Sequence, residues 1–153
     1  LAIPGEHNVR NALAAIAACL DAGVPIEKIV DTLAGFNGAH RRFEIKGKIG
    51  NGITVIDDYA HHPDEIAATL AAARKYKDAR VVCVFQPHTY SRVKLLMNDF
   101  VNALSLADVV IMAEVYSDRE ADNMGVSSKD ISDRLVTLGH EAYYLDSFEK
   151  RFK

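Results

Sequence analysis

Two short runs hold most of the side chains that could do chemistry in this chain of 153 residues. The first, residues 57–63, reads Asp-Asp-Tyr-Ala-His-His-Pro. An imidazole can donate or accept a hydrogen bond and be neutral near pH 7, and the carboxylates of Asp57 and Asp58 could accept from ribose hydroxyls. Capping of the next helix by a polar loop is the alternative. Ligand binding is favoured because a cap needs one short polar residue, not the histidine pair His61 and His62.

The second run, residues 86–92, reads Gln-Pro-His-Thr-Tyr-Ser-Arg. It combines His88 with Arg92, whose guanidinium can hold a carboxylate or a phosphate through two parallel hydrogen bonds. Ser91 is expected to cap the next helix, whose amino-terminal dipole also favours an anion. A solvated loop with an ordinary cap is the alternative. The run therefore predicts an anion-binding segment.

Two further motifs lie nearer the N-terminus. Residues 4–11 read Pro-Gly-Glu-His-Asn-Val-Arg-Asn, and His7 and Asn11 share one face of the expected helix. An Asn amide can pair with the N6 and N7 edge of adenine, although an Asn-type helix cap explains the motif equally well. Further along, the adjacent residues Arg41 and Arg42 follow the candidate link between domains. They are either two exposed surface charges or, at a domain junction, residues that reach a phosphate bound on the neighbouring domain.

Several other chemistries are disfavoured by the spacing of residues. His61, His62 and His88 lack both the His-x-His or His-x-x-x-His spacing and the cysteine partners of zinc sites, so we expect no metal bound by these residues alone. Cys19 and Cys83 lie in apolar segments, which indicates buried thiols and not nucleophiles. There is no Gly-rich Lys-Ser/Thr loop to cradle a triphosphate.

Composition narrows the classes of protein further. Hydrophobic residues make up 49% and charged residues 25%, which is typical of a folded α/β or α-rich chain. The 18 Lys and Arg against 21 Asp and Glu give a net charge of −3, which argues against a global grip on nucleic acid. The longest apolar run, residues 12–20, is too short to cross a bilayer. We expect no membrane association and a reducing, cytoplasmic location.

The first third of the chain is expected to be the end of a larger domain. Residues 8–23 are Ala-rich and end on a glycine, and residues 25–34 repeat apolar side chains at helical spacing. Residues 35–38 break the pattern and are the candidate link between domains. Two helices cannot form a core, and the chain opens with Leu and not Met. Residues 1–37 are therefore expected to be the tail of a preceding domain.

After the link, strand and helix patterns alternate. We expect strands at 43–49, 53–57, 80–85, 108–113 and 141–145, and helices at 63–76, 91–104, 128–138 and from 146 onward. Near-continuous apolar strands separated by helices predict an α/β fold with a mainly parallel sheet and helices on both faces. The strand at 80–85 is expected to be buried on both faces. In such a sheet ligands bind beyond the carboxyl ends of the strands, where residues 57–63, 86–92 and 114–120 gather polar and aromatic side chains.

At these residues the sequence resembles the Mur ligases, the ATP-dependent amino-acid ligases of peptidoglycan synthesis. The matching motifs are Gly5-x-His7-Asn8-x-x-Asn11, Phe36-x-Gly38-x-x-Arg41-Arg42-Phe43-Glu44, Asp57-Asp58-Tyr59-Ala60-His61-His62-Pro63, Phe85-Gln86-Pro87-His88-x-Tyr90-Ser91-Arg92 and Glu114-Val115-Tyr116. They span essentially the whole chain in family order. Within the family, the run at 86–92 points to the members that add L-alanine to UDP-N-acetylmuramate.

The resemblance implies a bacterial, cytoplasmic enzyme of three domains. Residues 1–37 would end the central ATP-binding domain, and residues 38–153 would be the Rossmann-like, amino-acid-binding C-terminal domain, truncated at its end. ATP and Mg²⁺ would be bound mainly by the rest of the central domain, and UDP-N-acetylmuramate by domains outside this chain. The implied reaction activates the muramoyl carboxylate as an acyl phosphate, which the amine of L-alanine then attacks.

The resemblance also implies roles for single residues. It places His7, Asn8 and Asn11 at the adenine, Arg42, Asp58 and Tyr59 at the rest of the nucleotide, and His61, His88 and Arg92 at the incoming L-alanine. The sequence departs from the family at Thr89, where many members have Arg, so that Arg92 would carry more of the alanine clamp. Two alternatives stay open: a Mur-type ligase that recycles peptides, and a nucleotide- or ligand-binding domain without chemistry.

Overall fold

The computed structural model describes residues 3, 5–50, 52–76 and 79–147. The chain divides into two units, Leu1–Ala60 and His61–Lys153, called here the N-terminal unit and the C-terminal unit. The expected helix from residue 146 onward and Asn51 of the expected turn at 50–52 lie outside the described residues. None of the described helices is long and apolar enough to cross a membrane.

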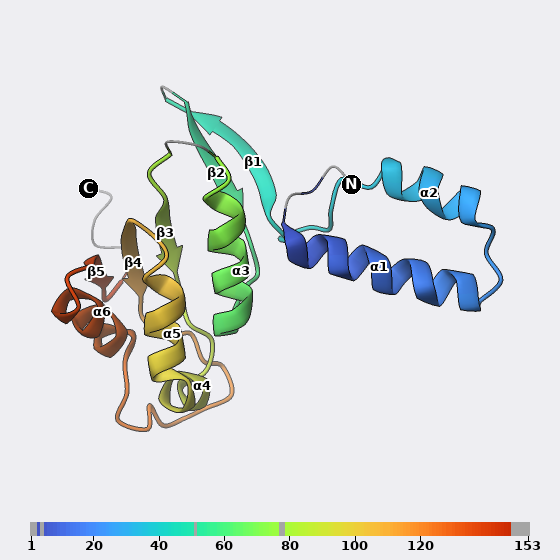
Figure 1. Cartoon of the computed structure of the whole chain (residues 1–153). Helices are drawn as coiled ribbons and strands as arrows, with labels where there is room; N and C mark the ends of the chain where they lie inside the picture. The colour runs from blue at the N-terminus through green and yellow to red at the C-terminus, as the bar shows by residue number, and fades with distance from the viewer. Residues whose placement is uncertain (1–2, 4, 51, 77–78, 148–153) are drawn as a thin grey trace. The chain divides into compact units, whose positions relative to one another are not determined.

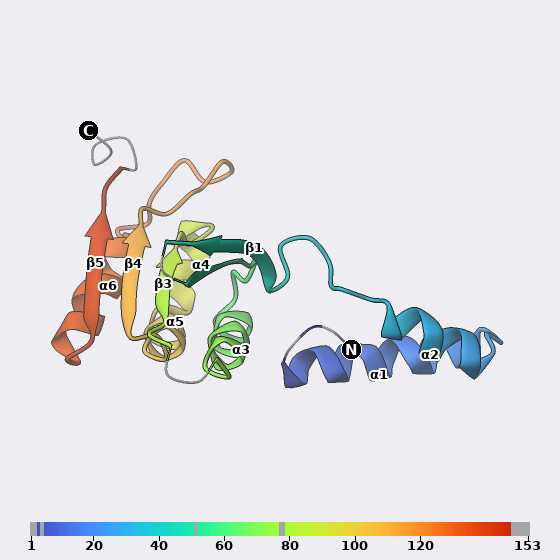
Figure 2. The same cartoon turned by 90° about the horizontal axis from the view of Figure 1, so that it is seen from above.

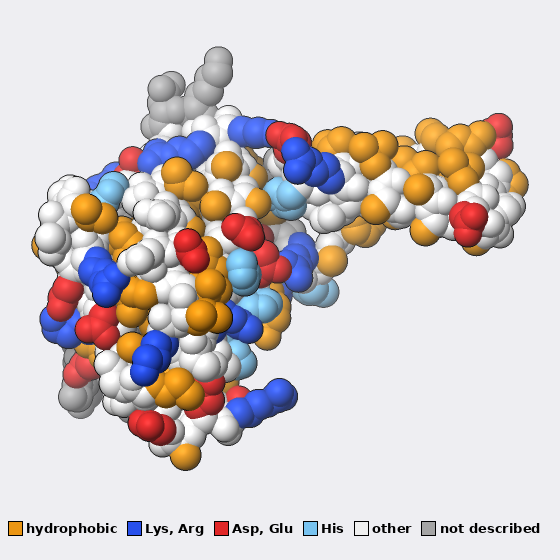
Figure 3. Space-filling model, turned by 60° about the horizontal axis from the view of Figure 1, so that its bottom comes forward, with side chains coloured by type: hydrophobic (Ala, Val, Ile, Leu, Met, Phe, Trp, Pro, Cys, Tyr) orange, Lys and Arg blue, Asp and Glu red, His pale blue; other side chains and the backbone are white. Residues whose placement is uncertain are grey.

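The N-terminal unit begins with two helices, α1 (Glu6–Asp21) and α2 (Ile26–Ala34), which pack against each other. Both were expected from the sequence. None of the residues of α1 is buried, and in α2 only Ile29 is. Figure 3 shows hydrophobic side chains spread over the surface of this helical segment. About half of each side chain is exposed at Val9 (50%) and Val30 (55%), so the pair does not enclose a core of its own.

The same unit continues into an antiparallel hairpin of β1 (Glu44–Ile49) and β2 (Ile53–Asp57). Both strands match the predicted ones within one residue. Glu44 lies opposite Asp57 at the open end, and the register shifts between Ile45 and Gly47 through a bulge. The pairing therefore brings the segment before β1 next to the segment after β2.

The C-terminal unit is an α/β domain. Its elements are α3 (Pro63–Ala73), β3 (Val82–Phe85), α4 (Tyr90–Leu95), α5 (Met97–Leu104), β4 (Val109–Ala113), α6 (Ser128–Thr137) and β5 (Glu141–Leu145). The three strands are parallel in the order β3-β4-β5, and Figure 2 shows their arrows pointing the same way. The predicted fold class, an α/β fold with a parallel sheet, is confirmed.

The core of this unit lies between β4 and the helices α5 and α6. α3 and α5 lie side by side (Figure 1), and α6 packs against β4 and β5. Fully buried side chains come from all three central elements: Phe100 and Leu104, Val110 and Met112, Ile131 and Leu135. This packing fixes the positions of the strand ends from which the loops of the candidate site depart.

Two local expectations were wrong. Strand β3 is not buried on both faces: Val82 is 51% and Val84 is 61% exposed, because the C-terminal unit covers only the face that carries Cys83 and Phe85. On the covered face, burial raises the pKa of the Cys83 thiol to about 11, as expected of a buried and unreactive thiol. The helix expected at 91–104 is divided at Leu96 into α4 and α5.

An ion pair ties the start of the sheet to the end of α3. Arg74 donates from Nη1 and Nη2 to the two carboxylate oxygens of Asp108, at 2.7 and 2.8 Å, and also to the carbonyl of Leu106. Asp108 in turn accepts from the backbone N–H of Val81. These hydrogen bonds, those from Arg74 first, lower the pKa of Asp108 below its ordinary value of 3.8. The carboxylate thus joins the beginnings of β3 and β4 to α3.

Asp108→Asn is expected to lower the thermal unfolding midpoint of this chain at pH 7, because the neutral amide loses the charge-assisted bonds to Arg74. Since the pKa of Asp108 is lowered by folding, its stabilisation is complete above about pH 3.8 and is lost as the pH falls below that value. The difference in midpoint between the two proteins, measured by circular dichroism, should therefore shrink between pH 5 and pH 3. Asp133→Asn, which breaks the exposed i,i+4 pair with Lys129, is the control and should change the midpoint less. A pH-independent difference would contradict this role.

Candidate functional site

The residues expected to act on ligands fall into both units. The N-terminal unit holds His7, Asn8 and Asn11 on α1 and Arg42, Asp58 and Tyr59 around the hairpin. The C-terminal unit holds His61, His88 and Arg92. We describe three groups in turn: the junction segment (residues 40–44 and 57–60), the start of α1, and the loops at the carboxyl edge of the sheet.

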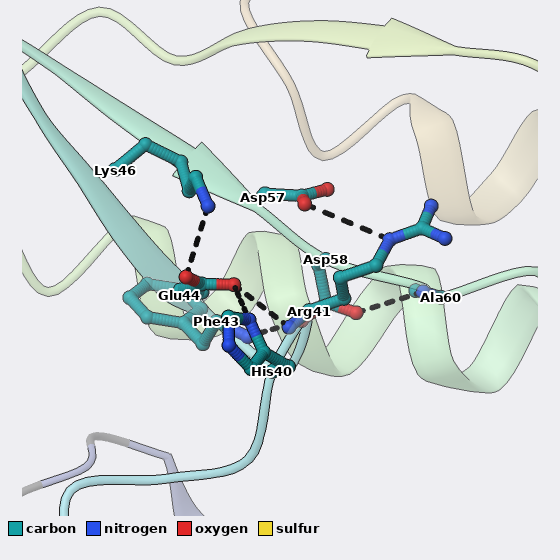
Figure 4. Close-up of polar contacts among 8 residues, drawn as sticks. All are labelled: His40, Arg41, Phe43, Glu44, Lys46, Asp57, Asp58 and Ala60. Atoms are coloured by element: carbon teal, nitrogen blue, oxygen red, sulfur yellow. Dashed lines mark hydrogen bonds and ion pairs between the residues drawn. The ribbon is translucent and has the colours of Figure 1, made fainter.

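Asp58 holds the junction segment together with both of its carboxylate oxygens. Oδ2 accepts from the backbone N–H of Phe43 at 2.9 Å, and Oδ1 accepts from the N–H of Ala60 at 2.7 Å (Figure 4). The N–H of Tyr59 donates to the carbonyl of Arg41 at 2.8 Å. The chain leaving β2 is thereby fastened to the chain entering β1. Asp58, expected to contact the nucleotide, has this architectural role in the unit itself.

The twin arginines have different surroundings. The guanidinium carbon of Arg41 lies 4.6 Å from the ring centroid of Tyr59, a cation–π distance, and its Nε lies 3.6 Å from Asp57. Arg42 is exposed and stands between two residues with left-handed backbone, Arg41 (φ 54) and Phe43 (φ 49). Such angles are uncommon for residues with side chains and must be held by their surroundings. The backbone on both sides of Arg42 is therefore fixed by neighbouring groups.

Glu44 is the second group that fixes this backbone, and the sequence reasoning did not select it as a site residue. Its Oε2 accepts from the N–H of Arg41 at 2.9 Å, and Lys46 Nζ lies 3.0 Å from its Oε1. The N–H of Arg41 foremost, then Lys46 and the ring of His40, lower the pKa of Glu44 to about 2. The only available signal was its place in the motif directly after Arg-Arg-Phe.

The pKa of the Glu44 carboxyl should be about 2 in the folded chain against an ordinary 4.5, as followed by the side-chain carboxyl carbon shift in an NMR titration. Lys46→Met is expected to raise this pKa, because it removes the second largest favourable partner. Arg41→Ala keeps the backbone N–H that matters most and should leave the pKa nearly unchanged. A pKa near 4.5 in the parent chain, or a larger effect of Arg41→Ala than of Lys46→Met, would show that the described contacts do not hold this carboxylate.

The motif at the start of α1 has a physical explanation in Gly5. Gly5 precedes the helix with φ 109, and a Cβ built on it would lie 2.5 Å from Cε1 of the His7 ring. The ring thus lies against a backbone position that only glycine can provide. Because α1 begins at Glu6, Asn8 and Asn11 lie inside the helix and neither is its N-cap. The explanation of this motif as an Asn-type helix cap is therefore wrong.

The first histidine run divides into one capping and one candidate residue. His62 caps α3: its Nδ1 accepts from the N–H of Asp64 at 3.3 Å, and the Glu65 carboxylate accepts from the N–H groups of His61 and His62. The argument that a histidine would not cap was wrong, since an imidazole nitrogen is an adequate acceptor. The ring of His61 lies 3.4 Å from Glu65 through Nδ1 and its side chain is 34% exposed. The ring of His61 therefore lies next to Glu65, and its contact with a ligand stays a prediction.

At the carboxyl edge of the sheet, the loop after β3 is joined to the loop after β4. The N–H of Tyr116 donates to the carbonyl of Pro87 at 2.9 Å, and the N–H of Thr89 donates to the carbonyl of Tyr116 at 3.1 Å. The rings of His88 and Tyr116 lie with centroids 5.9 Å apart. Parallel pairing of β3 and β4 therefore continues one step beyond the strands and carries His88 on a fixed backbone.

Arg92 follows on the first turn of α4. Its Nη1 donates to the carbonyl of His88 at 3.4 Å, and no carboxylate among the described residues lies within ion-pair distance of it. Other arginines of the chain are paired, for example Arg74 with Asp108 and Arg80 with Glu141. A partly buried guanidinium that keeps its donors for a further partner fits a bound carboxylate or phosphate.

The expected anion site at the amino end of this helix is occupied by the protein itself. α4 begins at Tyr90, and Thr89, not Ser91, is its N-cap, without a side-chain capping bond to the described residues. The N–H groups of Tyr90 and Ser91 donate to the carboxylate of Glu120, which lies in the loop after β4. The expectations that Ser91 caps the helix and that its amino end takes an external anion were therefore wrong.

A second carboxylate, Glu114, connects the strand ends beneath these loops. It accepts from Ser127 Oγ at 2.6 Å, from the Tyr144 hydroxyl and from the N–H of Val115, while Gln86 donates to its backbone carbonyl. Burial alone would raise the pKa of Glu114, but these hydrogen bonds outweigh burial and lower it. The hydrogen bond to Glu114 foremost, then burial and the charge of Glu114, raise the pKa of Tyr144 to about 12. Glu114 thus joins the ends of β3, β4 and β5 to the start of α6.

Among the described residues, no three His, Cys, Asp or Glu side chains gather as a metal ion would require. The acidic groups near the candidate ligand residues are already committed to backbone N–H groups. Each unit by itself therefore presents arginines and histidines, side chains suited to an anionic ligand.

Comparison with known proteins defines the class. The model of the Mur ligase, glutamate ligase domain matches residues 41–153, and the chain therefore belongs to the Mur ligase family. The chain is 56% identical over 150 residues to the UDP-N-acetylmuramate–L-alanine ligase of Agathobacter rectalis, covering 98% of this chain and 32% of that protein. It is also 56% identical over 149 residues to the ligase of the same name from Lachnospira eligens, with 97% and 32% covered. The chain thus spans about a third of the length of these relatives.

Solved structures agree with this result. The UDP-N-acetylmuramate–alanine ligase of Thermotoga maritima matches with a TM-score of 0.76 and 40% identity, over 95% of this chain and 30% of that one. A murein peptide ligase from Psychrobacter arcticus matches with a TM-score of 0.68 and 30% identity, over 95% and 30%. The resemblance found in the sequence is confirmed at the level of the family and of the fold.

Proposed function

We propose that this chain is part of an ATP-dependent ligase that joins L-alanine to UDP-N-acetylmuramate during peptidoglycan synthesis in the bacterial cytoplasm. Family membership and 56% identity to two ligases of that name support the proposal. In it, residues 1–37 end the central ATP-binding domain and residues 38–153 form most of the C-terminal domain. The exposed apolar surface of α1 supports the first assignment, because such a helix needs further chain to cover it.

The observation that carries the proposal is the pair of joined loops at the carboxyl edge of the sheet. They place the half-buried His88 and the guanidinium of Arg92 on one fixed backbone, with a hydrogen bond from Arg92 to the His88 carbonyl. Free alanine is a zwitterion, so its site needs a cation for the carboxylate and a group that accepts a proton from the ammonium. Arg92 supplies the first and the imidazole of His88 or His61 the second.

The chemistry constrains the order of these events. Phosphoryl transfer from ATP turns the muramoyl carboxylate into an acyl phosphate, which an amine attacks only after its ammonium has lost a proton. In the proposal Arg92 holds the alanine carboxylate, and a neutral imidazole takes the proton as the nitrogen approaches the acyl carbon. The tetrahedral adduct then expels phosphate and leaves the amide bond. Thr89, where the family resemblance expects Arg, leaves the carboxylate to Arg92.

The N-terminal unit is proposed to contact the nucleotide. His7, Asn8 and Asn11 are assigned to the adenine, with the asparagine amides inside α1 and not used as caps. Arg42 is assigned to a phosphate, because it is exposed on a backbone held from both sides. Asp58 and Tyr59 are placed with it, because hydrogen bonds to Phe43 and Arg41 fasten their segment to the backbone on both sides of Arg42. Mg²⁺ is assigned mainly to the rest of the central domain, as membership of the family suggests.

In the intact enzyme, Arg92→Ala should raise the KM for L-alanine by roughly 10- to 100-fold, the equivalent of one charged hydrogen-bonded contact. The KM for ATP should change little. Arg42→Ala should show the opposite pattern, with weakened use of ATP and a normal KM for L-alanine. Initial-rate kinetics with each substrate varied in turn measures both.

Arg134→Ala is the matched control, because this exposed arginine on α6 contacts only Asn98 among the described residues. It should leave both constants unchanged. An unchanged KM for L-alanine in Arg92→Ala would remove that residue from the amino-acid site. Equal effects of Arg92→Ala and Arg42→Ala on both substrates would contradict the assignment of L-alanine to Arg92 and of ATP to Arg42.

A peptide-recycling ligase is the second candidate, favoured by the likeness to the murein peptide ligase. A recycling ligase would add a tripeptide in place of L-alanine. Assaying the full-length protein with free L-alanine and, separately, with such a tripeptide decides between the two. A binding domain without chemistry is the third, and tight calorimetric binding of ATP by residues 1–153 alone would favour it.

A further inference from the structure

We propose that Glu120 is a positioning residue for the amino-acid substrate: it fixes the loop that carries His88 and Arg92. This inference rests on the proposed function and deepens it, because it concerns the same site. Glu120 does not touch the substrate in this proposal. It acts through the backbone of α4.

The contacts of Glu120 reach across from one loop to the other. Its Oε2 accepts from the N–H of Tyr90 and, at 3.3 Å, from the N–H of Ser91. Its own loop is closed by Ser117, whose Oγ accepts from the Glu120 N–H at 3.2 Å and donates to the carboxylate at 3.4 Å. The carboxylate is thus held on the loop after β4 and binds the first turn of α4.

The backbone at this point needs such support. Thr89 has φ 73, an unfavourable conformation for a β-branched residue, and its N–H is bonded to the carbonyl of Tyr116. Thr89 is also the N-cap of α4, and its side chain makes no capping bond with the described residues. The acceptor that a capping side chain normally supplies comes instead from Glu120, 31 residues further along the chain.

The direction of Arg92 depends on this arrangement. Arg92 is the third residue of α4, and its Nη1 donates back to the carbonyl of His88, the residue before Thr89. If Glu120 is removed, the strained Thr89 can relax and the first turn of α4 loses its acceptor. The guanidinium and the imidazole then lose their fixed relation, and displacements of this kind reduce substrate use strongly.

Glu120 also determines where the substrate carboxylate cannot bind. An anion already occupies the amino end of α4, and the hydroxyl of Ser91 first, then the backbone bonds, lower the pKa of Glu120 so that it stays charged. A second carboxylate would be repelled from that position. The guanidinium of Arg92 is left as the cation for the incoming amino acid.

The test uses the full-length enzyme and compares Glu120→Ala with Glu141→Ala, a control that removes an exposed glutamate paired with Arg80 at the start of β5. Glu120→Ala is expected to raise the KM for L-alanine about 10-fold and to leave the KM for ATP unchanged. Glu141→Ala should leave both unchanged. Adding Thr89→Gly to Glu120→Ala should restore part of the affinity for L-alanine, because glycine adopts the required φ without strain.

The outcomes separate the possible failures. A parent enzyme that does not use L-alanine refutes the proposed function. A parent enzyme that does, with an unchanged KM for L-alanine in Glu120→Ala, or with the constants for ATP and L-alanine raised equally, overturns the positioning role alone. No recovery on adding Thr89→Gly would also overturn it. Should Glu120→Ala fail to fold, Glu120→Gln keeps the size and one acceptor oxygen: a severalfold rise in the KM for L-alanine supports the role, and no rise refutes it.

Discussion

One interaction recurs where this chain enters or leaves regular structure: a carboxylate that accepts hydrogen bonds from backbone N–H groups, which lie either a few residues away or on a distant segment. Asp58 and Glu44 do so at the hairpin junction, Glu65 at the start of α3, and Glu120 at the start of α4. Hydrogen bonds to a charged acceptor are about twice as strong as neutral ones. They can therefore hold loop segments that contribute little apolar surface to a core.

The same carboxylates coincide with backbone that needs to be held. Arg41, Phe43 and Thr89 all have positive φ, and each is bonded directly, or through its neighbour, to Glu44, Asp58 or Glu120. Residues in such conformations cluster at functional sites because the surrounding structure must enforce them. Apart from Met124, the described non-glycine residues with positive φ flank Arg42 or precede Arg92, the two arginines assigned to anionic ligands. Strain and charge pairing together thus fix the backbone on which each arginine is carried.

The rest of the fold provides a base for these loops. The core between β4, α5 and α6 is fully buried. The carboxylate of Glu114 connects the end of β4 to Tyr144 of β5 and to Ser127 before α6, and its backbone carbonyl accepts from Gln86 after β3. By contrast, α1 exposes its apolar residues, and β3 leaves Val82 and Val84 half exposed. This chain, which spans about a third of the length of its relatives, thus combines one well-packed unit with apolar surfaces that are exposed.

The sequence by itself determined the order and type of the helices and strands, the α/β class, the family, and the runs that would carry chemistry. The elements and the fold class follow from periodicity and local spacing, which act over a few residues, whereas the family follows from the resemblance of its motifs. Tertiary structure decided what each polar residue does. It made His62 a helix cap and placed the anion at the start of α4 inside the protein, as Glu120. It also divided the helix at Leu96 and left one face of β3 open. Such outcomes depend on which N–H groups lie near a carboxylate, and on which face of a strand is covered by other elements. Periodicity and local spacing do not predict these long-range contacts, because they form only when distant segments pack together.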